Sequence, residues 1–362
     1  MRVVTFGEVM LRLSPPGFRR IRQSIPGTLE ATFGGGELNV AVSIAVQGGQ
    51  AAFLTAVPDN VITDCLLQEL RKLGVDDRLV LRRPEGRFGV YFVETGADQR
   101  GGTVTYDRSG STVSLLDGTA YDWEAAFADA TWFHVTGITP ALSAAAAHAA
   151  SAAVHEARRR GLTVSCDLNF RKKLWRWDPQ TPPVALARRV MRALVRQVDL
   201  LIANEEDVQL ALGIDAEGTD VESGRLNVRG YESMARTITE RFDVGRVAIT
   251  LRESLSASHN NWGAMLYEAG ADRCWYAPTD EAGTYRPYAI AHIVDRVGAG
   301  DSFAGALIFA LQTPELADPE TALRYAVAAS CLKHTMPGDF NYATRAEIEA
   351  LMRGSASGRV QR

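Results

Sequence analysis

The stretch DRVGAGDSFAGALIFAL, residues 295–311, constrains the fold more strongly than any other part of the chain. Gly298 and Gly300 flank one alanine, and Asp301 follows directly before a run of small and apolar residues that predicts a helix. Glycines let the backbone approach a ligand closely, and the free N–H groups and dipole of a helix start favour negative charge. The stretch therefore predicts an anion-binding loop at the beginning of a helix.

Asp301 has two interpretations at this position. An aspartate at a helix start is a common N-cap residue. Beside a phosphate site it is instead a general base, which the helix N-terminus keeps ionised and which orients a hydroxyl and accepts its proton late in phosphoryl transfer. The pattern G-x-x-x-x-G-K-[ST] is absent from the sequence, and this excludes a P-loop NTPase.

A second glycine-rich stretch, FGGGELNVAVSIAVQGG at residues 33–49, also leads into a predicted helix. The first turns of that helix carry Glu37 and Asn39. The glycines form either a tight connection or, together with the asparagine, a surface that meets the hydroxyls of a small polyol. The residues alone leave both interpretations open.

Around these two stretches, β-rich segments alternate with helical ones. Strands rich in Val, Ile and Leu that are separated by helices predict a parallel sheet covered on both faces. Thr139 and Pro140 predict the N-cap and first residue of an alanine-rich helix that continues to Gly161. The predicted strands are 2–8, 51–57, 130–137, 162–170, 198–204 and 246–251, and the other predicted helices are 36–49, 62–75 and 184–197.

Two segments interrupt this alternation and predict a small separate sheet. Residues 10–33 contain prolines, arginines and glycines without a helical period, and residues 82–114 contain a predicted hairpin, FGVYFVETG and GTVTYDRSGS, around a polar turn. Over the carboxyl edge of a parallel sheet, such a sheet would be a lid. We therefore expect a core at residues 1–9, 34–83 and 115–350, a lid at 10–33 and 84–114, and a disordered tail at 351–362.

Composition and charge exclude several classes of protein. The 362 residues carry a formal net charge of −4, so no basic surface for nucleic acid or an anionic membrane is expected. A signal-peptide core and a membrane-spanning apolar run are both absent from the sequence. The histidines show no metal-ligand spacing, and His334 is interpreted as a packed helix-end residue. The cysteines form no C-x-x-C pair, which predicts buried free thiols in a reducing, cytoplasmic compartment; they are Cys65, Cys166, Cys274 and Cys331.

Taken together, these stretches resemble the PfkB, or ribokinase-like, family of carbohydrate kinases. GGGELNVAVSIAVQGG is similar to the family's N-terminal glycine signature and DRVGAGDSFAGALIFAL to its C-terminal signature, and FGE, DLNFR and NEED extend the resemblance over nearly the whole chain. TYDRSGS, DLNFRKKLW, TLRES and LKHTMPGDFN resemble the 2-keto-3-deoxygluconate kinase branch. The resemblance implies an α/β fold with a three-layer α/β/α ribokinase-like core, a mainly parallel sheet and a small β-sheet lid.

The resemblance also implies an activity and the residues that perform it. The activity is an ATP- and Mg²⁺-dependent phosphorylation of a primary hydroxyl on a small sugar acid, with 2-keto-3-deoxygluconate and its 6-phosphate as the first expectation. A monovalent cation is left open as a further cofactor. The implied catalytic residues are Asp301 as base and Gly298, Ala299 and Gly300 as anion hole; the substrate residues are Gly34, Gly35, Asn39, Tyr91, Tyr106, Arg108, Arg171 and Asp339; the nucleotide residues are Asn169, Asn204, Thr250, Arg252 and Ser254; and the metal residue is Asp207.

Two arginines are the reason to expect an acidic sugar. Guanidinium groups hold carboxylates by charge-assisted hydrogen bonds, and a neutral sugar does not need two of them. The alternatives are that Arg108 is an exposed surface residue, that Arg171 pairs with Asp167, and that Tyr91 and Tyr106 only pack the hairpin or a partner subunit.

Three features depart from the family pattern. Asp207 stands where a glutamate usually serves the metal, and two glutamates precede it, so the acid that serves Mg²⁺ stays open. Arg296 replaces the usual threonine, and the expected nucleotide loop after the strand 246–251 reads RESLSASHNNWGA, residues 252–264, instead of a compact glycine turn. We expect Arg252 or Arg296 to supply positive charge to the phosphates of ATP.

Other functions stay open on the sequence. Within the family, a fructokinase or another sugar kinase is the next alternative. A non-catalytic sugar-binding regulator is disfavoured by the intact Asp301 and glycine loop, and an oxidoreductase is disfavoured because no G-x-G-x-x-G follows the first strand. The expected partners are ATP, a small sugar acid and further copies of the chain, which we expect to pair through the lid as a homodimer or larger assembly.

Overall fold

The computed structural model describes residues 1–215 and 228–354. Residues 216–227 of the predicted core and residues 355–362 of the predicted tail lie outside the described residues. The last helix, α13 (Arg345–Met352), includes the first part of the predicted tail. The tail predicted from residue 351 therefore begins too early, because the core helix continues past that point.

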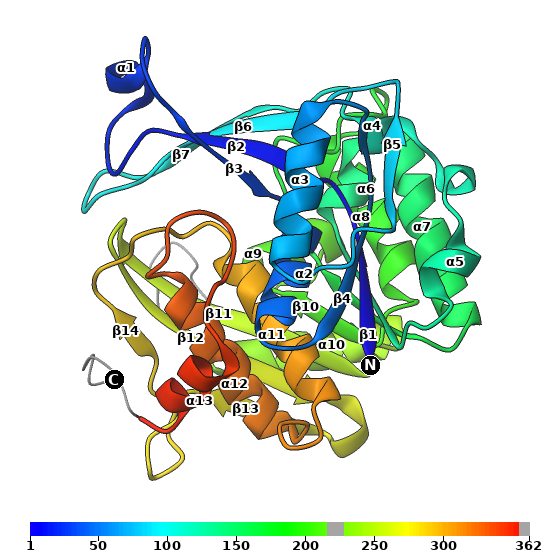
Figure 1. The fold of residues 1–362 in the computed structure, drawn as a ribbon. Coiled ribbons are helices and arrows are strands. Elements are labelled where there is room, and N and C mark those ends of the chain that lie inside the picture. The colour runs from blue at the N-terminus through cyan, green and yellow to red at the C-terminus, as the bar shows by residue number, and fades with distance from the viewer. Residues whose placement is uncertain (216–227, 355–362) are drawn as a thin grey trace.

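A ten-stranded sheet forms the centre of the molecule (Figure 1). Its strands run parallel from β5 to β11, and antiparallel strands extend the sheet beyond β11. The sheet is therefore mainly parallel, as predicted. Its order is β13 (Arg273–Ala277), β12 (His259–Glu268), β11 (Arg246–Ser256), β10 (Leu200–Ala203), β9 (Thr163–Asp167), β8 (Trp132–Thr136), β1 (Arg2–Phe6), β4 (Gln50–Pro58) and β5 (Val80–Arg83), with β14 (Tyr288–Ile290) paired to β12.

Helices cover both faces of this sheet and complete the predicted three-layer core. In β1, Val3 packs into one apolar core, while Val4 and Phe6 pack into the other, because successive side chains of a strand point to opposite faces. One layer contains α2 (Gly36–Val46), α3 (Val61–Lys72), α11 (Ala299–Gln312), α12 (Pro319–Lys333) and α13; the other contains α4 (Thr112–Leu115), α5 (Trp123–Phe127), α6 (Ile138–Leu142), α7 (Ala144–Arg159), α8 (Pro183–Val195), α9 (Glu205–Leu212) and α10 (Val228–Phe242).

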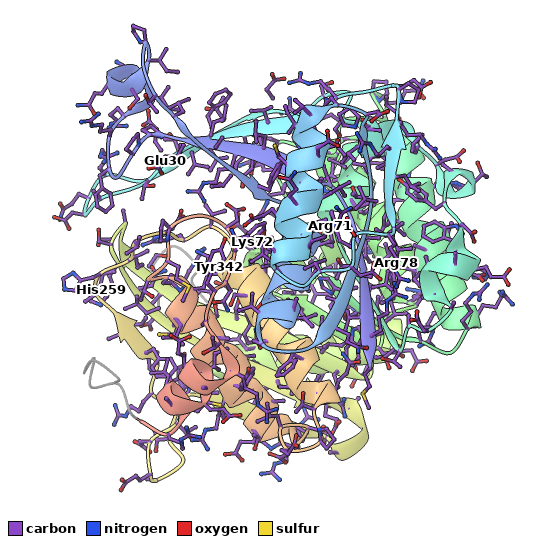
Figure 2. All side chains as sticks on the ribbon, viewed as in Figure 1. Glu30, Arg71, Lys72, Arg78, His259 and Tyr342 are labelled. Atoms are coloured by element: carbon purple, nitrogen blue, oxygen red, sulfur yellow. The ribbon has the colours of Figure 1, made fainter. Side chains whose placement is uncertain are left out.

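The outer faces of the helices carry the charged residues. On α3, Arg71 and Lys72 point away from the core, with side chains that are 63% and 68% exposed (Figure 2). Among the described residues, no helix is both long and apolar enough to cross a bilayer.

A second sheet, of four strands, projects from the core at the upper left of Figure 1. The predicted hairpin is present as the antiparallel pair β6–β7, in which Tyr91 lies opposite Tyr106. Strand β2 pairs with β6 in parallel, so two distant segments of the chain form one sheet. The order is β3 (Glu30–Gly34), β2 (Met10–Ser14), β6 (Gly89–Glu94) and β7 (Thr103–Asp107), with helix α1 (Ile21–Ser24) at the far end.

Two local predictions are wrong in the first half of the chain. Thr139 lies inside the short helix α6, and the cap of α7 is Ser143, whose hydroxyl accepts the N–H of Ala146 at 2.9 Å. Both Thr139 and Ser143 satisfy the sequence rule for an N-cap, and packing decides between them. All four cysteines are free as predicted, but only Cys166 is buried; Cys65 is exposed on α3, and Cys274 and Cys331 are half-buried.

The segment at residues 252–264 is not a loop. Strand β11 continues to Ser256 and β12 starts at His259, so the segment forms the two arms of an antiparallel hairpin with a tight turn. The β11 arm of this hairpin is exposed or half-buried from Arg252 to Ser256, whereas Asn260 and Trp262 of the β12 arm are buried.

The path of the chain places the small sheet beside the carboxyl ends of the core strands. The chain leaves β1 at Phe6 and enters β2 at Met10, and helix α11 starts at the same side of the molecule. In open α/β sheets, ligands bind in the crevice outside the carboxyl ends of the strands. The region between the two sheets is therefore where a ligand site is expected.

Candidate active site

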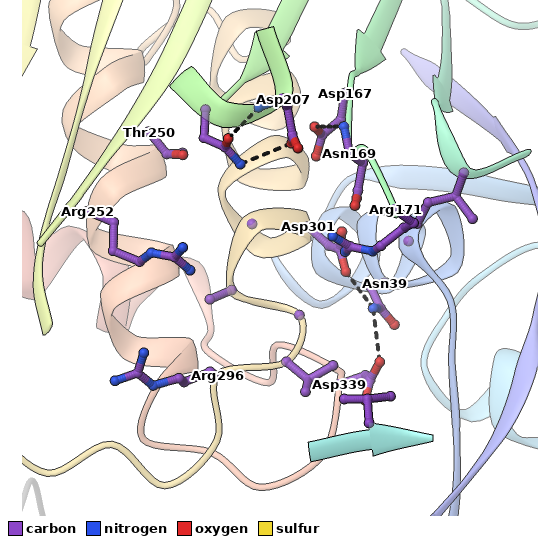
Figure 3. Close-up of a pocket in the computed structure, with 18 of the residues that line it drawn as sticks. Asn39, Asp167, Asn169, Arg171, Asp207, Thr250, Arg252, Arg296, Asp301 and Asp339 are labelled. Carbon is purple, nitrogen blue, oxygen red and sulfur yellow. Dashed lines mark hydrogen bonds between the residues drawn. The ribbon is translucent and has the colours of Figure 1, made fainter. Parts of the chain in front are cut away.

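A cavity of about 850 Å³ lies between the small sheet and the carboxyl ends of the core strands (Figure 3). Its size and location are typical of a small-molecule site. Gly34 lies behind the wall of the cavity, where a Cβ would overlap the Tyr91 hydroxyl and the Asp339 carboxylate. The other predicted residues line the cavity: Gly35, Asn39, Tyr91, Tyr106, Arg108, Asn169, Arg171, Asn204, Asp207, Thr250, Arg252, Ser254, Gly298, Ala299, Gly300, Asp301 and Asp339.

The predicted anion loop enters α11 with Gly298 as the N-cap residue. Gly298 has a φ of 83°, and a Cβ there would overlap the backbone oxygen of Asp339. Glycine is therefore required both by the backbone conformation and by the close packing of two loops. Asp301 is not the N-cap, because it lies inside the first turn of the helix, and its carboxylate is available for other contacts.

The carboxylate of Asp301 accepts a hydrogen bond from the side-chain amide of Asn39 on α2. The Nδ2 atom of Asn39 donates to Asp301 Oδ2 at 2.6 Å and to Asp339 Oδ2 at 3.3 Å, so the amide connects two carboxylates (Figure 3). The Oδ1 atom of Asn39 accepts the N–H of Gly35 at 3.3 Å, and this contact keeps the amide nitrogen toward the carboxylates. Asn39, predicted as a substrate residue, is thus also part of the support of Asp301.

Burial raises the pKa of Asp301 to about 6. The hydrogen bond from Asn39 and the charge of Arg171 oppose this shift, whereas the nearby Asp339 and Glu37 carboxyls add to it. Asp301 is therefore ionised at neutral pH and more basic than an ordinary aspartate. Both properties suit a group that accepts a proton from an alcohol.

The small sheet contributes an aromatic and cationic wall. The rings of Tyr91 and Tyr106 stack with their centroids 6.1 Å apart, and the Arg108 guanidinium lies 5.3 Å from the centre of the Tyr106 ring. Arg108 is 9% exposed and forms an ion pair with the buried Glu8, so the alternative of an exposed surface arginine is wrong. Tyr91 is buried beside the Asp339 carboxylate, and burial together with that charge holds the pKa of its hydroxyl well above the usual range.

Arg171 reaches the cavity from the segment after β9 (Figure 3). Asp167, its predicted alternative partner, accepts the N–H of Asn169 at 3.1 Å. Burial holds the pKa of Asp167 well above its usual range, the charges of Asp207 and Asp301 add to the shift, and Arg171 opposes it. In the described parts of the chain, the two side chains influence each other without forming an ion pair, so the guanidinium is available to an anionic ligand.

Asn204 and Asp207 form a compact unit at the start of α9. Asn204 is the N-cap: its Oδ1 accepts the N–H of Asp207 at 2.9 Å, and its Nδ2 donates to Asp207 Oδ2 at 3.0 Å. Burial raises the pKa of Asp207 to about 7, with Arg171 opposing the shift. The buried Oδ1 of Asn169 has no partner among the described residues, and its backbone φ of 37° is left-handed. This end of the cavity thus groups carboxylate and amide oxygens, the ligand atoms that Mg²⁺ prefers.

Arg252 and Arg296 line the cavity but have different environments. The Nε atom of Arg296 donates to the Ala257 carbonyl at 3.0 Å, and its Nη2 donates to the Ser256 carbonyl, so Arg296 braces the β11–β12 turn. In Figure 3, Arg296 extends away from Asp301, whereas Arg252 extends from β11 toward the start of α11. Thr250 and Ser254 lie on the same strand as Arg252.

Several residues of the site were not predicted from the sequence. Glu8 belongs to the FGE stretch, but its ion pair with Arg108 joins distant segments. Arg12 occupies a buried position of β2, between Met10 and Ser14, which are also buried. A charged residue in the buried register of an alternating strand is a signal that could have identified Arg12. The other unpredicted lining residues include Asn260, Trp262 and the buried His334.

Comparison with known proteins gives matches over nearly the whole chain. The family model of the pfkB family carbohydrate kinases matches residues 1–227 and 248–343. A 2-dehydro-3-deoxygalactonokinase of Haloferax volcanii is 33% identical over 358 residues, 98% of each chain, and a fructokinase-1 of rice is 27% identical over 97% of each. The crystal structure of a 2-dehydro-3-deoxygluconokinase of Thermotoga maritima superposes with a TM-score of 0.87 at 43% identity, over 98% of this chain and 100% of that one.

The packing of Gly298 generates a prediction about stability. We expect Gly298→Ala to lower the free energy of unfolding by about 2–4 kcal/mol, because left-handed strain adds to an overlap with the Asp339 carbonyl. Gly338→Ala is the matched control, since Gly338 has a φ of +84° but no atom near the added Cβ, and we expect a loss of about 1–2 kcal/mol. Urea denaturation measures both, and equal losses would contradict the prediction.

Proposed function

The chain belongs to the pfkB family of carbohydrate kinases, and we propose that it transfers the γ-phosphoryl group of ATP to a primary hydroxyl of a 2-keto-3-deoxy sugar acid. The observation that carries this proposal is the cavity itself, in which an anion loop and a basic carboxylate face a wall of arginines and tyrosines. The first substrate we propose is 2-keto-3-deoxygluconate, converted to its 6-phosphate. Two of the relatives described above are named for kinases of such acids, which supports this choice.

Asp301 is the base that we assign to the reaction. Its carboxylate accepts the proton of the sugar hydroxyl while the new bond to the γ-phosphorus forms and the bond from that phosphorus to the bridging oxygen of ADP breaks. The proton moves late, because the transition state is loose and the alcohol becomes acidic only as the new bond forms. The N–H groups at the start of α11, beside Gly298 and Gly300, stabilise the charge on the transferring group.

The carboxylate of the sugar acid is the feature that we assign to the arginines. Arg171 lines the cavity and forms no ion pair among the described residues, so a ligand carboxylate can take that place. Arg108 is held in position by Glu8 and by the Tyr106 ring, which fixes its guanidinium at the wall of the cavity. A site with such fixed cations discriminates strongly against a ligand that cannot pair with them.

The residues at the start of α9 fit a magnesium ion. The described residues contain no cluster of three or more His, Cys, Asp or Glu that could enclose a metal. Mg²⁺ usually keeps several waters and binds through one or two carboxylates together with phosphates, so a full protein cage is not required. Asp207 is the carboxylate we assign, because burial raises its pKa to about 7 and a cation would offset that cost. When bound, the ion neutralises charge on the phosphates.

A substrate panel tests the proposed function. ADP release is measured with ketodeoxygluconate, ketodeoxygalactonate, gluconate, fructose, ribose and adenosine. We expect kcat/KM for at least one ketodeoxy acid to exceed that for fructose by about 100-fold or more. We expect Arg171→Met to reduce this preference by about 10-fold or more, whereas the exposed neighbour change Lys172→Met leaves it intact.

The panel separates the alternatives. A preference for fructose would identify a fructokinase. Release with none of the compounds by folded protein would favour a sugar-binding regulator, and calorimetric titration of the same compounds would then detect binding without turnover.

The role of Asp301 gives a prediction about pH. Because the base acts in its ionised form and its pKa is raised to about 6, kcat falls as the pH decreases through this value and is constant above it. We expect Asp301→Asn to lower kcat by about 1,000-fold or more while ATP still binds. Asp318→Asn, at the N-cap of α12, is the control and leaves kcat unchanged. Turnover retained in Asp301→Asn would assign the base to another residue.

The two arginines at the nucleotide end give a prediction about ATP. Arg252 has its guanidinium directed into the cavity, whereas that of Arg296 is occupied by the β11–β12 turn. We expect Arg252→Ala to raise the KM for ATP by about 10-fold, the value of a lost charge-assisted hydrogen bond. We expect Arg296→Ala to change it by less than about 3-fold. Steady-state kinetics with varied ATP checks this, and the reverse order of effects would contradict it.

A further inference from the structure

Arg12 joins the small sheet to the core through two buried ion pairs. It lies on β2 and is 2% exposed. Its Nη1 donates to Asp339 Oδ1 at 2.7 Å, and its Nη2 donates to Asp295 Oδ2. Asp295 and Asp339 are each 4% exposed and lie in different loops of the core. A planar guanidinium can bridge two carboxylates in this way, whereas a lysine ammonium is a single point of charge.

One of these carboxylates, that of Asp339, connects Arg12 to the base Asp301 through hydrogen bonds. The other oxygen of Asp339 accepts from the amide of Asn39, and the same amide donates to Asp301 at 2.6 Å. Arg12 therefore positions the carboxylate of Asp339. That carboxylate orients the amide of Asn39, and the amide orients the carboxylate of Asp301.

The other carboxylate, that of Asp295, connects Arg12 to the anion loop through hydrogen bonds. The Oδ1 atom of Asp295 accepts the N–H of Val297 at 3.0 Å, immediately before Gly298. Its Oδ2 atom accepts the N–H of Gly338 at 3.1 Å, so Asp295 also ties the anion loop to the loop that carries Asp339. Arg12 thus forms an ion pair with an acid in each of these two loops.

Arg12 also pairs across the small sheet with a residue that lines the cavity. In the parallel pair of β2 and β6, Arg12 is the register partner of Tyr91, which lines the cavity. A shift of the small sheet that moved Tyr91 would move Arg12 with it. The contacts to both loops would then change together with the contacts to the sugar.

We propose that Arg12 is a positioning residue, which couples the placement of the small sheet over the sugar to the orientation of Asp301 and of the anion loop. This inference deepens the proposed function and rests on it. Arg12 acts through Asp339, Asn39 and Asp295 and does not itself line the cavity.

Removal of Arg12 also changes the charge around Asp301. The charged groups near Asp301 are Glu37 on α2, Asp167 at the end of β9, Arg171 in the following segment, Lys333 on α12 and Asp339 in the loop after α12. Without Arg12, the negative charge of Asp339 loses its nearest cation and acts more strongly on Asp301. A like charge raises the pKa of a carboxyl group, so the base becomes harder to ionise.

The test compares Arg12→Gln and Arg12→Lys with Arg87→Gln. Arg87 lies just before β6 of the same small sheet but forms an exposed ion pair with Asp107, so its loss is the matched control. For Arg12→Gln we expect kcat to fall about 10- to 100-fold, the effect of a displaced catalytic group, with a smaller change in the KM for the sugar. We expect the acidic limb of kcat to move to higher pH. For Arg12→Lys we expect a lower kcat with the acidic limb near that of the wild type, and for Arg87→Gln no change.

A second readout does not require turnover. The pKa of Asp301 is measured in the ligand-free protein by carboxyl ¹³C NMR, with its signal assigned through Asp301→Asn. We expect a higher value in Arg12→Gln than in the wild type and no shift in Arg87→Gln. If the wild type phosphorylated no sugar acid, the proposed function would fail, whereas this readout would still decide the role of Arg12.

In Arg12→Gln two buried carboxylates lose their cation. A second variant keeps the proposal testable if Arg12→Gln does not fold. In Arg12→Gln/Asp339→Asn one charge of each sign is removed, and we expect a folded protein with a low kcat and a pKa of Asp301 no higher than in the wild type. A folded Arg12 variant with the kcat and acidic limb of the wild type would overturn the proposal. A lower kcat in Arg12→Gln with an unmoved pKa of Asp301 would reduce Arg12 to a structural role and would also overturn it.

Discussion

One side-chain amide, that of Asn39, holds two carboxylates in position, and much of the site depends on it. The nitrogen donates to Asp301 at 2.6 Å and to Asp339 at 3.3 Å, while Gly35 fixes the amide from the other side. Without this amide, Asp301 would lose a hydrogen-bond donor and face the like charge of Asp339, which Arg12 would still hold. The helices α2 and α11 pack side by side, and their contact brings these groups together. The role of the large sheet and its helical layers is thus to give a neutral amide a defined place between two acids.

The cavity contains more acidic groups than their immediate surroundings can neutralise. Burial raises the pKa of Asp207 to about 7 and that of Asp301 to about 6, and Asp167 is shifted upward as well. Such groups reduce stability in the absence of a ligand, and sites of catalysis are where proteins tolerate this cost. Glu37 is more deeply buried and burial raises its pKa as well, but hydrogen bonds from Thr136 and Thr139 at 2.8 Å oppose the shift. Glu37 is thus held by hydrogen bonds within the protein, whereas Asp167, Asp207 and Asp301 line the cavity.

The parts of the molecule that were predictable are those in which local chemistry determines structure. The glycine loop before α11 and the alternation of strands and helices are encoded within a few residues, so the anion loop and the layered core followed from the sequence. The pairing of Arg108 with Glu8 and of Arg12 with Asp339 depends on contacts between distant segments, which no local pattern contains. The wrong N-cap at Thr139 has a different origin, because two residues satisfied the same local rule and packing selected Ser143. The hairpin of β11 and β12 was missed since its polar residues resemble those of a loop.

The small sheet consists of two excursions of the chain, and each excursion returns to the core. The chain crosses between core and small sheet after Phe6, after Gly34, after Arg83 and after Asp107, and the parallel pairing of β2 with β6 joins the two excursions. A flap on a single hinge swings freely, but a sheet tied to the core at four points can only tilt as a unit. The β6–β7 turn adds a non-covalent tie, because the Asp98 carbonyl accepts the N–H of Ala257 in the β11–β12 turn of the core at 2.7 Å. Helix α1 instead contacts Glu94 of β6, within the small sheet (Figure 1). Variation in α1 can therefore change the neighbours that this end of the sheet meets without disturbing the wall that lines the cavity.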